Sequence, residues 1–315
     1  MKVVRSLTEY AAPVDPVATI GNFDGQHRGH QALLRTVVET AKRRAGTPVV
    51  ITFDPHPIRI LAPHVPLRFL TSPEDKLAAF ESAGIREVVF LPFTPTFAAL
   101  SPESFVADTL SGTLRLREIF VGEHFAFGKG RAGRFDDLRR LCEARGIVVH
   151  AITPVCVDGA IVSSTRIRRL LQDGGIEEAT RCLGRRYAWT GRVVEGEGRG
   201  RELGWPTANL PVPMERVVPK DGVYAASATW QHKTFDSIAY LGTRPTFEAD
   251  GTRFLEVHLL DERQKLYGEV ITVEFVAHLR DDRTFPSAEA LAAQIETDVA
   301  AARTRLSALG HPSQA

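Results

Sequence analysis

The hydrophobic periodicity of this chain changes near residue 185, and this change constrains the fold more than any other feature of the sequence. Before that point short apolar runs alternate with helical patterns, which is typical of strand–helix–strand units and a parallel sheet. Beyond it apolar and polar residues alternate between Gly, Pro and Asp turns, as in antiparallel strands. Because 315 residues exceed what one hydrophobic core usually serves, we expect two domains, at 1–184 and 185–315.

The first half contains five apolar runs that we expect to be buried strands, at 17–20, 49–53, 88–91, 118–121 and 147–152. Helical patterns lie between them, at 73–84 and 135–146 and after His30, where one face carries Leu33, Leu34, Val37, Val38 and Ala41. This order predicts a parallel sheet covered by helices, with ligands bound beyond the carboxyl ends of the strands.

The second half contains shorter strands, which we expect at 187–194, 223–230, 237–241, 254–260 and 271–279. In the last of these, one side of the strand carries Ile271, Val273, Phe275, Ala277 and Leu279. Several such strands predict a small antiparallel barrel. A helix is expected to follow at 287–309, with Ser287 as its N-cap.

The stretch from Gly21 to His30, between the first expected strand and the first expected helix, carries the first candidate site. Gly21, Gly25 and Gly29 permit a tight turn and a close approach of the backbone to a ligand. The free N–H groups at the start of the helix suit an anion such as a phosphate, and His27 and His30 stand three apart, so both rings can face it. The alternatives are a glycine-rich turn with incidental histidines, or half of a metal site.

The HxGH pattern at 27–30 resembles the nucleotidylyltransferase superfamily, which transfers a nucleoside monophosphate from ATP or CTP. Class I aminoacyl-tRNA synthetases share the pattern, but the sequence contains nothing comparable to their lysine-rich second signature. Instead, Ser-Ser-Thr-Arg-Ile-Arg follows the last strand of the first half, at 163–168. Ser163 or Ser164 would cap a helix there, and Thr165 and Arg168 would present a hydroxyl and a guanidinium to a triphosphate. Alone, the stretch is equally consistent with a capped, solvated basic helix.

A second candidate site lies beyond residue 185. A glycine-rich loop at 196–204 is followed by Trp-Pro-Thr-Ala-Asn at 205–209. The Thr207 hydroxyl and the Asn209 amide oxygen, two apart in an extended segment, lie on one side and offer the hard oxygen ligands that magnesium prefers. Glu256 is a carboxylate inside an apolar strand, where it is either functional or ion-paired with an arginine such as Arg253.

Taken together, these motifs resemble the bifunctional riboflavin kinase/FAD synthetase family of bacteria. The resemblance also includes Ile-Thr-Phe-Asp-Pro-His-Pro at 51–57 and the segment at 122–133, and it covers nearly the whole chain. It implies a Rossmann-like parallel-sheet nucleotidylyltransferase domain followed by a small antiparallel β-barrel riboflavin kinase domain with a terminal helix. It also implies two reactions, ATP-dependent phosphorylation of riboflavin to FMN and adenylylation of FMN by ATP to FAD with release of pyrophosphate.

The resemblance also implies roles for particular residues. The residues implied for the adenylyltransferase are His27 and His30 in catalysis, Asn22, Asp24, Gly29, Ser164, Thr165 and Arg168 in ATP binding, and Gly122, His124, Phe125 and Phe127 on the flavin or adenine side. Those implied for the kinase are Glu256 as the base and Gly198, Gly200, Gly204, Pro206, Thr207 and Asn209 in ATP binding, with Thr207 and Asn209 also holding Mg²⁺. The chain departs from the family pattern at Gln26, His124, Arg134 and Tyr240.

Charge and cysteine content limit the partners and the location. A net charge of +1 argues against binding driven by attraction to nucleic acid or to a membrane surface, so we expect small-molecule partners: riboflavin, FMN and ATP. Three scattered cysteines fit a reducing compartment, and no apolar run approaches the roughly 18 residues of a membrane span. We therefore expect a cytoplasmic protein that is a monomer or a weak homo-oligomer.

Two other functions remain consistent with the sequence. One is a single-activity cytidylyl- or adenylyltransferase with a barrel appendage. The other is a flavin- or RNA-binding regulator that kept the fold and lost the chemistry. The near-neutral charge disfavours RNA, and the intact HxGH, Pro-Thr-Ala-Asn and Glu256 disfavour lost chemistry.

Overall fold

The computed structural model describes residues 1–315 except 9, 197–203, 244–252, 263 and 309–315. The described chain divides into two compact units, Met1–Ser164 and Thr165–Ala315. The first unit contains a parallel sheet and the second an antiparallel one, as the change of periodicity predicts. Two helices that precede residue 184, α7 (Ser164–Gln172) and α8 (Ile176–Leu183), fall almost entirely in the second unit, where α8 packs on the barrel strands.

The first unit is built on a six-stranded sheet in the order β1-β4-β3-β2-β5-β6, with every neighbouring pair parallel. Its strands are β1 (Lys2–Val4), β2 (Pro16–Ile20), β3 (Thr47–Asp54), β4 (Glu87–Pro92), β5 (Glu118–Gly122) and β6 (Val148–Ile152). The five expected strands are confirmed. The sixth, β1, is only three residues long, too short to show a period in the sequence.

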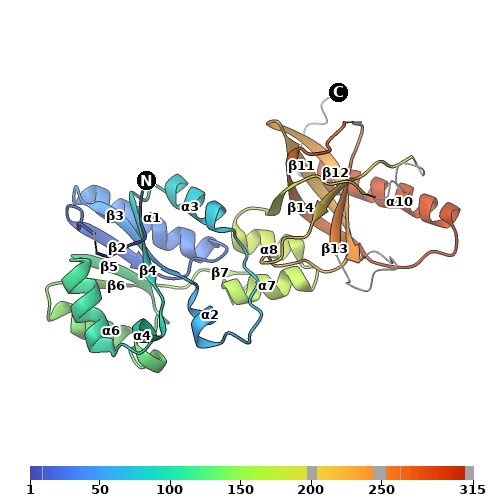
Figure 1. Cartoon of the computed structure of the whole chain (residues 1–315). Helices are drawn as coiled ribbons and strands as arrows, with labels where there is room; N and C mark the ends of the chain where they lie inside the picture. The colour runs from blue at the N-terminus through green and yellow to red at the C-terminus, as the bar shows by residue number, and fades with distance from the viewer. Residues whose placement is uncertain (9, 197–203, 244–252, 263, 309–315) are drawn as a thin grey trace. The chain divides into compact units, whose positions relative to one another are not determined.

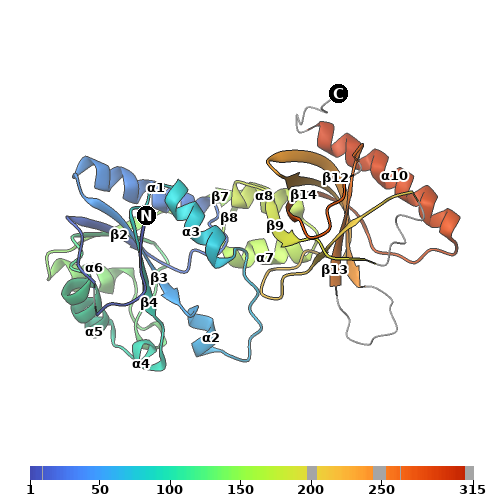
Figure 2. The same cartoon turned by 45° about the horizontal axis from the view of Figure 1, so that its top comes forward.

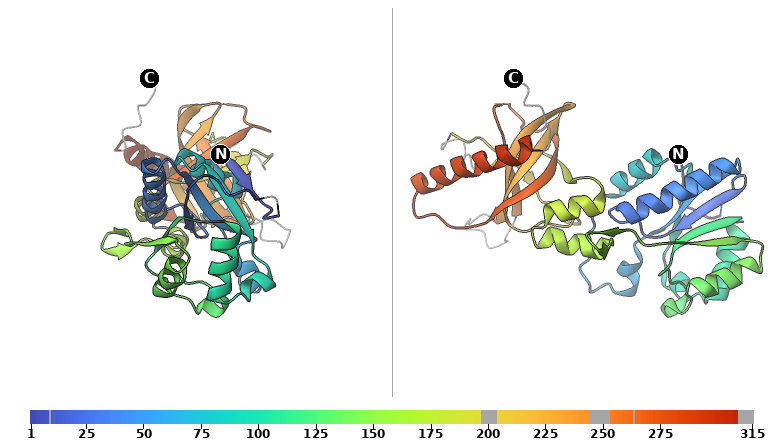
Figure 3. Two further views of the ribbon diagram at one scale, coloured as in Figure 1. Left: turned by 90° about the vertical axis from the view of Figure 1, so that its left-hand side faces the viewer. Right: turned by 180° about the vertical axis from the view of Figure 1, so that it is seen from behind.

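Helices cover both faces of this sheet (Figure 1). Successive residues of a strand point to opposite faces, so Val17 and Val50 enter one core while Ala18 and Ile51 enter the other. The first core is completed by α1 (Arg28–Arg43) and α3 (Pro73–Ser82), and the second by α6 (Phe135–Glu143) and the π-helix η1 (Phe105–Thr113). Figure 3 shows the same layers from behind. The apolar face expected for α1 is confirmed.

The order of the strands fixes where a ligand can bind. From β2 the chain passes through α1 to β3 on one side, whereas β5 pairs with the other side of β2. The loops that follow β2 and β5 therefore diverge at the carboxyl edge of the sheet, which is the usual position of a nucleotide site in such folds. The short connecting elements of this unit are α2 (Pro57–Leu61), α4 (Pro95–Ala98), α5 (Pro102–Ser104), η2 (Lys129–Arg131), β7 (Cys156–Val157) and β8 (Ala160–Ile161).

The second unit is a nearly closed barrel of six strands in the order β10-β13-β12-β11-β14-β9. The strands are β9 (Tyr187–Arg192), β10 (Ala208–Pro211), β11 (Gly222–Trp230), β12 (Lys233–Thr243), β13 (Arg253–Leu259) and β14 (Val270–Asp281). A bridge between Val194 and Asn209 joins the two ends of the sheet. Helix α10 (Ala288–Ser307) lies against the outside of the barrel (Figure 2), and Ser287 caps it by accepting a hydrogen bond from Ala290 N.

The regular alternation expected along 271–279 holds only to Phe275. Ile271, Val273 and Phe275 are buried on the same side of β14, but the register with β11 shifts after Phe275, and Val276 and Ala277 both join the core beneath α10. An extra residue in one strand of a pair produces such a β-bulge and reverses the face of every residue that follows. Ala277 and Leu279 therefore pack against α10, on the opposite side from Phe275.

Candidate active sites

The loop after β2 brings the two histidines of the HxGH motif into contact. His27 is the N-cap of α1, and its Nδ1 accepts a hydrogen bond from His30 N at 3.4 Å. The rings of His27 and His30 stack, with their centroids 3.7 Å apart and their planes at 17°. Gly29 leaves room for this arrangement, because a Cβ there would make a tight contact of 3.2 Å with the His27 ring. The two rings therefore lie side by side at the start of the helix.

His30 is held in its neutral form. Burial lowers the pKa of its imidazole well below the ordinary value, and the charges of His27 and Lys76 lower it further. Its Nδ1 is buried and has no hydrogen-bond partner within the described part of the chain. An unpaired polar atom in such a position costs free energy unless a ligand or water satisfies it. The geometry therefore suits a substrate atom that exchanges a hydrogen bond with His30.

Asp24 and Asn22 are used in a different way from the histidines. The buried Asp24 carboxylate accepts hydrogen bonds from Leu70 N at 2.9 Å, Thr71 N at 3.2 Å and Thr71 Oγ1 at 3.3 Å. Gly25 N in turn donates to Thr71 Oγ1 at 3.2 Å. These contacts fasten the loop to the segment before α3. Asn22 contributes its backbone carbonyl, which accepts a hydrogen bond from Lys76 Nζ at 3.0 Å.

Lys76 is a neighbour of this loop that the motifs did not indicate, and it contacts Gln26 within the loop. Gln26, which departs from the expected family pattern, is buried, and its Nε2 donates a hydrogen bond to Lys76 O at 2.7 Å. Burial lowers the pKa of Lys76, while the carboxylates of Asp24 and Asp54 oppose that shift. No local signal in the sequence identifies Lys76, because α3 reaches the loop only through the tertiary fold.

The remaining adenylyltransferase candidates fall into two groups. Ser164 joins the loop, since its Oγ donates to Asp24 O at 2.8 Å, whereas Thr165 and Arg168 follow on α7 in the second unit. After β5, Gly122 and His124 are exposed and Phe125 stacks on Phe127, with ring centroids 5.7 Å apart. Phe127 is buried in the core beneath α6, so its main contacts are within the protein.

The second unit brings together Thr207, Asn209 and Glu256 from two neighbouring strands. Asn209 pairs directly with Glu256 in the β10–β13 ladder. Thr207 Oγ1 donates to Glu256 Oε2 at 3.5 Å, and Asn209 Nδ2 donates to Thr207 O at 3.5 Å. Asn209 is buried and Glu256 is half-buried. The alternative partner for Glu256 is engaged elsewhere, since Arg253 pairs with Asp221 at 3.0 Å.

Two residues confine this cluster. Gly196 lies so close to Asn209 that a Cβ would collide with the Asn209 amide. Tyr240 pairs with Glu256 from the other side, in the β12–β13 ladder. Burial raises the pKa of the Tyr240 hydroxyl, and Asp282 and Glu256 raise it further, so the phenol remains protonated. Of the predicted glycines, Gly204 precedes the Trp-Pro-Thr-Ala-Asn segment with φ of +87°, while Gly198 and Gly200 lie outside the described residues.

Other kinds of site are not found in the described part of the chain. No group of three or more His, Cys, Asp or Glu side chains there is arranged to hold a metal ion, so His27 and His30 are not part of such a cluster. None of the described helices combines the length and apolar character that crossing a membrane requires.

The fold and the two residue clusters define a two-domain protein that joins a nucleotidylyltransferase-type parallel sheet to a small antiparallel barrel. The family model for FAD synthetase matches residues 10–166, and that for riboflavin kinase matches residues 183–306. The chain belongs to the family of bifunctional riboflavin kinase/FMN adenylyltransferases.

Individual relatives agree with this assignment. The bifunctional riboflavin kinase/FMN adenylyltransferase of Pseudomonas fluorescens is 40% identical over 298 residues, which cover 94% of each chain. That of Escherichia coli (strain K12) is 38% identical over 306 residues, which cover 96% of this chain and 97% of the relative. A crystal structure described as a macrolide-efflux protein from Streptococcus pneumoniae has a TM-score of 0.87 and 31% identity, and covers 96% of this chain and 99% of its own.

Proposed function

We propose that the two reactions of this family occur at two separate sites on this chain, one in each of the regions 1–184 and 185–315. The chain is a bifunctional enzyme that phosphorylates riboflavin to FMN and adenylylates FMN to FAD, with ATP as co-substrate of both steps. The observation that carries the assignment to two sites is that the stacked His27–His30 pair lies in one unit and the Thr207–Asn209–Glu256 cluster in the other.

In the adenylyltransferase site, FMN phosphate attacks the α-phosphorus of ATP and pyrophosphate leaves. Negative charge builds up on the phosphate oxygens during this transfer, and donors aimed at that charge accelerate it. His30 is supported as such a donor by its neutral state and its buried, unpartnered Nδ1. The N-terminus of α1 adds free N–H groups and the positive end of its dipole. Ser164 completes the proposed ATP site within the first unit, since its Oγ donates to Asp24 O at 2.8 Å.

In the kinase site, Glu256 accepts the proton of the riboflavin 5′-hydroxyl as that oxygen attacks the γ-phosphorus of ATP and ADP leaves. Phosphoryl transfer depends mainly on alignment and on neutralising charge. Thr207 and Asn209 provide a hydroxyl and an amide oxygen beside that carboxylate, and such hard oxygen donors fit Mg²⁺, which would neutralise the ATP phosphates. We propose that these two residues hold the metal and that Glu256 is the base.

A separation-of-function experiment tests the proposal. His30→Ala removes one donor, and such a loss typically lowers the rate by about 10²–10³. FAD formation from FMN should fall by that amount while FMN formation from riboflavin stays normal. Glu256→Gln keeps the shape of the side chain but removes the base, so FMN formation should collapse while supplied FMN still becomes FAD. Glu262→Gln, at an exposed position of the same unit, is the control.

Each step is measured separately, by chromatography of the products made from riboflavin or from FMN with MgATP. Loss of both reactions in Glu256→Gln, in protein that circular dichroism shows to be folded, would require one shared site and would overturn the proposal. We also propose a cytoplasmic location, which is supported by the low number and wide spacing of the three cysteines, Cys142, Cys156 and Cys182.

A further inference from the structure

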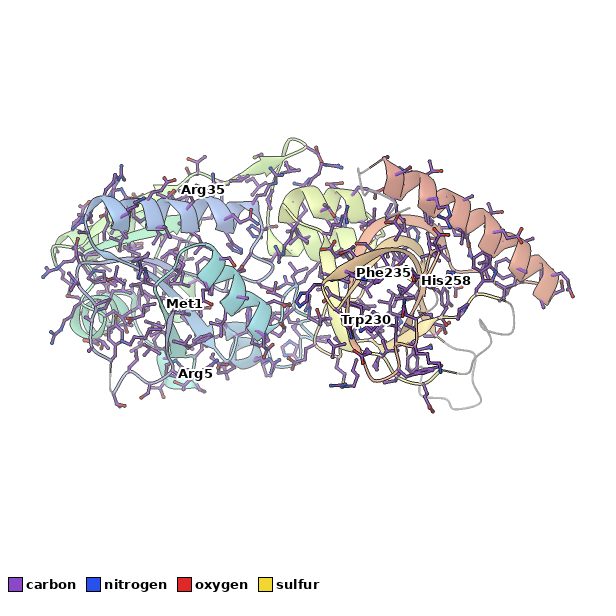
Figure 4. The ribbon with its side chains drawn as sticks, turned by 90° about the horizontal axis from the view of Figure 1, so that it is seen from above. Met1, Arg5, Arg35, Trp230, Phe235 and His258 are labelled. Atoms are coloured by element: carbon purple, nitrogen blue, oxygen red, sulfur yellow. The ribbon has the colours of Figure 1, made fainter. Side chains whose placement is uncertain are left out.

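His258 makes contacts that the proposed chemistry does not use. It stands on β13 two residues after Glu256, so both side chains point to the same face of the strand. Its Nδ1 lies 2.8 Å from Pro206 O. The His258 ring also meets the edge of Trp205, with ring centroids 5.2 Å apart and planes at 80°. His258 appears among the side chains of the barrel in Figure 4.

The direction of this hydrogen bond follows from the chemistry of the two groups. A carbonyl oxygen can only accept, so Nδ1 of His258 carries the proton and donates to Pro206. Pro206 is followed at once by Thr207, whose hydroxyl contacts Glu256. Two alternate residues of β13 therefore contact the segment that enters β10: Glu256 contacts Thr207, and His258 contacts Trp205 and Pro206.

This side-chain bond acts where the backbone ladder ends. The β10–β13 pairing begins at Ala208 opposite Val257, and no pairing between these two strands precedes it in the described chain. Thr207 thus lies just outside the ladder. The residue after it, Ala208, is paired with Val257 in β13, and the residue before it, Pro206, is bonded to His258. Without that bond, the backbone before Thr207 would lose a hydrogen bond to β13 that lies one residue from Thr207.

We infer that His258 is a positioning residue of the kinase site: its Nδ1–H fixes the Pro206 carbonyl and thereby sets the position of Thr207 beside Glu256. The inference rests on the proposed function, in which Thr207 and Asn209 hold the magnesium ion of MgATP. His258 acts through the strand entry and does not touch the reacting atoms. Its loss should therefore weaken the use of MgATP more than the binding of riboflavin.

Two amide substitutions distinguish the hydrogen bond from His258 to Pro206 O from the effect of side-chain volume alone. In asparagine the side-chain nitrogen is three bonds from Cα, like Nδ1 of histidine, so His258→Asn keeps a donor for Pro206 O. In glutamine the nitrogen is four bonds from Cα, like Nε2, so His258→Gln keeps the polarity and more of the volume but misplaces the donor. A hydrogen bond lost at a partly buried acceptor changes an equilibrium by about tenfold.

The experiment uses the full chain and measures FMN formation from riboflavin while free Mg²⁺ and ATP are varied. In His258→Gln we expect the KM for MgATP, and the free Mg²⁺ needed for half-maximal rate at saturating ATP, to rise about tenfold. The KM for riboflavin and the formation of FAD from FMN should stay within about twofold of wild type, because the inferred role of His258 is exerted through Pro206 and Thr207 on the metal alone. His258→Asn should restore most of the lost MgATP and Mg²⁺ dependence.

Three outcomes would overturn the inference: an unchanged Mg²⁺ dependence in His258→Gln, equal defects in the Asn and Gln variants, or a rise confined to the KM for riboflavin. Thermal unfolding followed by tryptophan fluorescence shows whether each variant is folded at the assay temperature. If His258→Gln is unfolded there, the comparison of His258→Asn with wild type decides, since a positioning role requires their Mg²⁺ dependences to agree. Absence of FMN formation by the wild-type chain would instead refute the proposed function itself.

Discussion

Asp24 is the residue whose substitution most sharply tests how the HxGH loop is built. Its carboxylate is only 2% exposed and accepts hydrogen bonds from two backbone N–H groups and one hydroxyl, contributed by Leu70 and Thr71. Asp24→Asn preserves size but removes the charge and turns one acceptor into an NH₂ group that faces donors. We expect this variant to loosen the loop and to destabilise the first unit.

The magnitude follows from the number of donors. A hydrogen bond to a charged group typically contributes about 1.5–3 kcal/mol, and solvent does not screen a carboxylate so deeply buried. Asparagine still offers one oxygen, so we expect about half of the three contacts to be lost, or about 3 kcal/mol in the free energy of unfolding. For a unit of this size that corresponds to a fall of about 6–12 °C in Tm.

The positions of the tryptophans make the assay specific to one unit. All three, Trp189, Trp205 and Trp230, lie in the second unit, so their fluorescence follows its unfolding, whereas far-ultraviolet circular dichroism also follows the helices of the first. The dichroism transition of Asp24→Asn should move to lower temperature while the fluorescence transition stays in place.

Asp136→Asn is the control for loss of a carboxylate in the first unit. The Asp136 side chain is 84% exposed and pairs only with Arg139 in the described structure, so its replacement should cost less than about 1 kcal/mol. If Asp24→Asn unfolds like wild type and only its KM for ATP in FAD formation rises, Asp24 binds nucleotide directly. The interpretation as a structural anchor would then be wrong.

Three further predictions concern single positions. Burial lowers the pKa of the His30 imidazole, so this side chain takes up a proton at lower pH in the folded state than in the unfolded state. The free energy of unfolding should therefore fall as the pH drops below about 6.5, by up to about 1.4 kcal/mol per pH unit. Dichroism melts at two pH values should show this loss in wild type and not in His30→Phe. Gly196→Ala should lower FMN formation about tenfold, since the new methyl group displaces Asn209, while FAD formation from FMN is unchanged in the same product assay. Asp298→Ala should lower the tryptophan-monitored stability by about 3 kcal/mol, because Arg280 loses the partner that holds β14 to α10 at 2.9 Å; a loss below 1 kcal/mol would show that Arg280 is already solvated.

The sequence predicts the two architectures because each has its own period. Runs such as 49–53 and 88–91 are apolar throughout, as strands covered on both faces must be, and their helices end at glycines. Alternation along β9 and along β11 to β14 predicts the barrel in the same way, whereas the four-residue β10 is not among the expected strands. What the sequence does not predict is any feature that depends on how two strands are paired. The bulge at Val276 is an example, because its position is set by the register with β11 and both side chains around it are apolar.

The same distinction divides the residues of the two sites. His27, His30, Thr207 and Asn209 can be identified locally, since each acts from a backbone conformation that its own neighbours determine. Their supports come from far along the chain: Thr71 is 47 residues from Asp24, and His258 is 52 residues from Pro206. A residue that supports a site needs only a donor or an acceptor at the correct distance, which many residue types provide, so it leaves no motif. Substitutions at such supports should therefore change KM or stability before they change the chemical step, and this order of effects distinguishes a support from a group that touches the substrate.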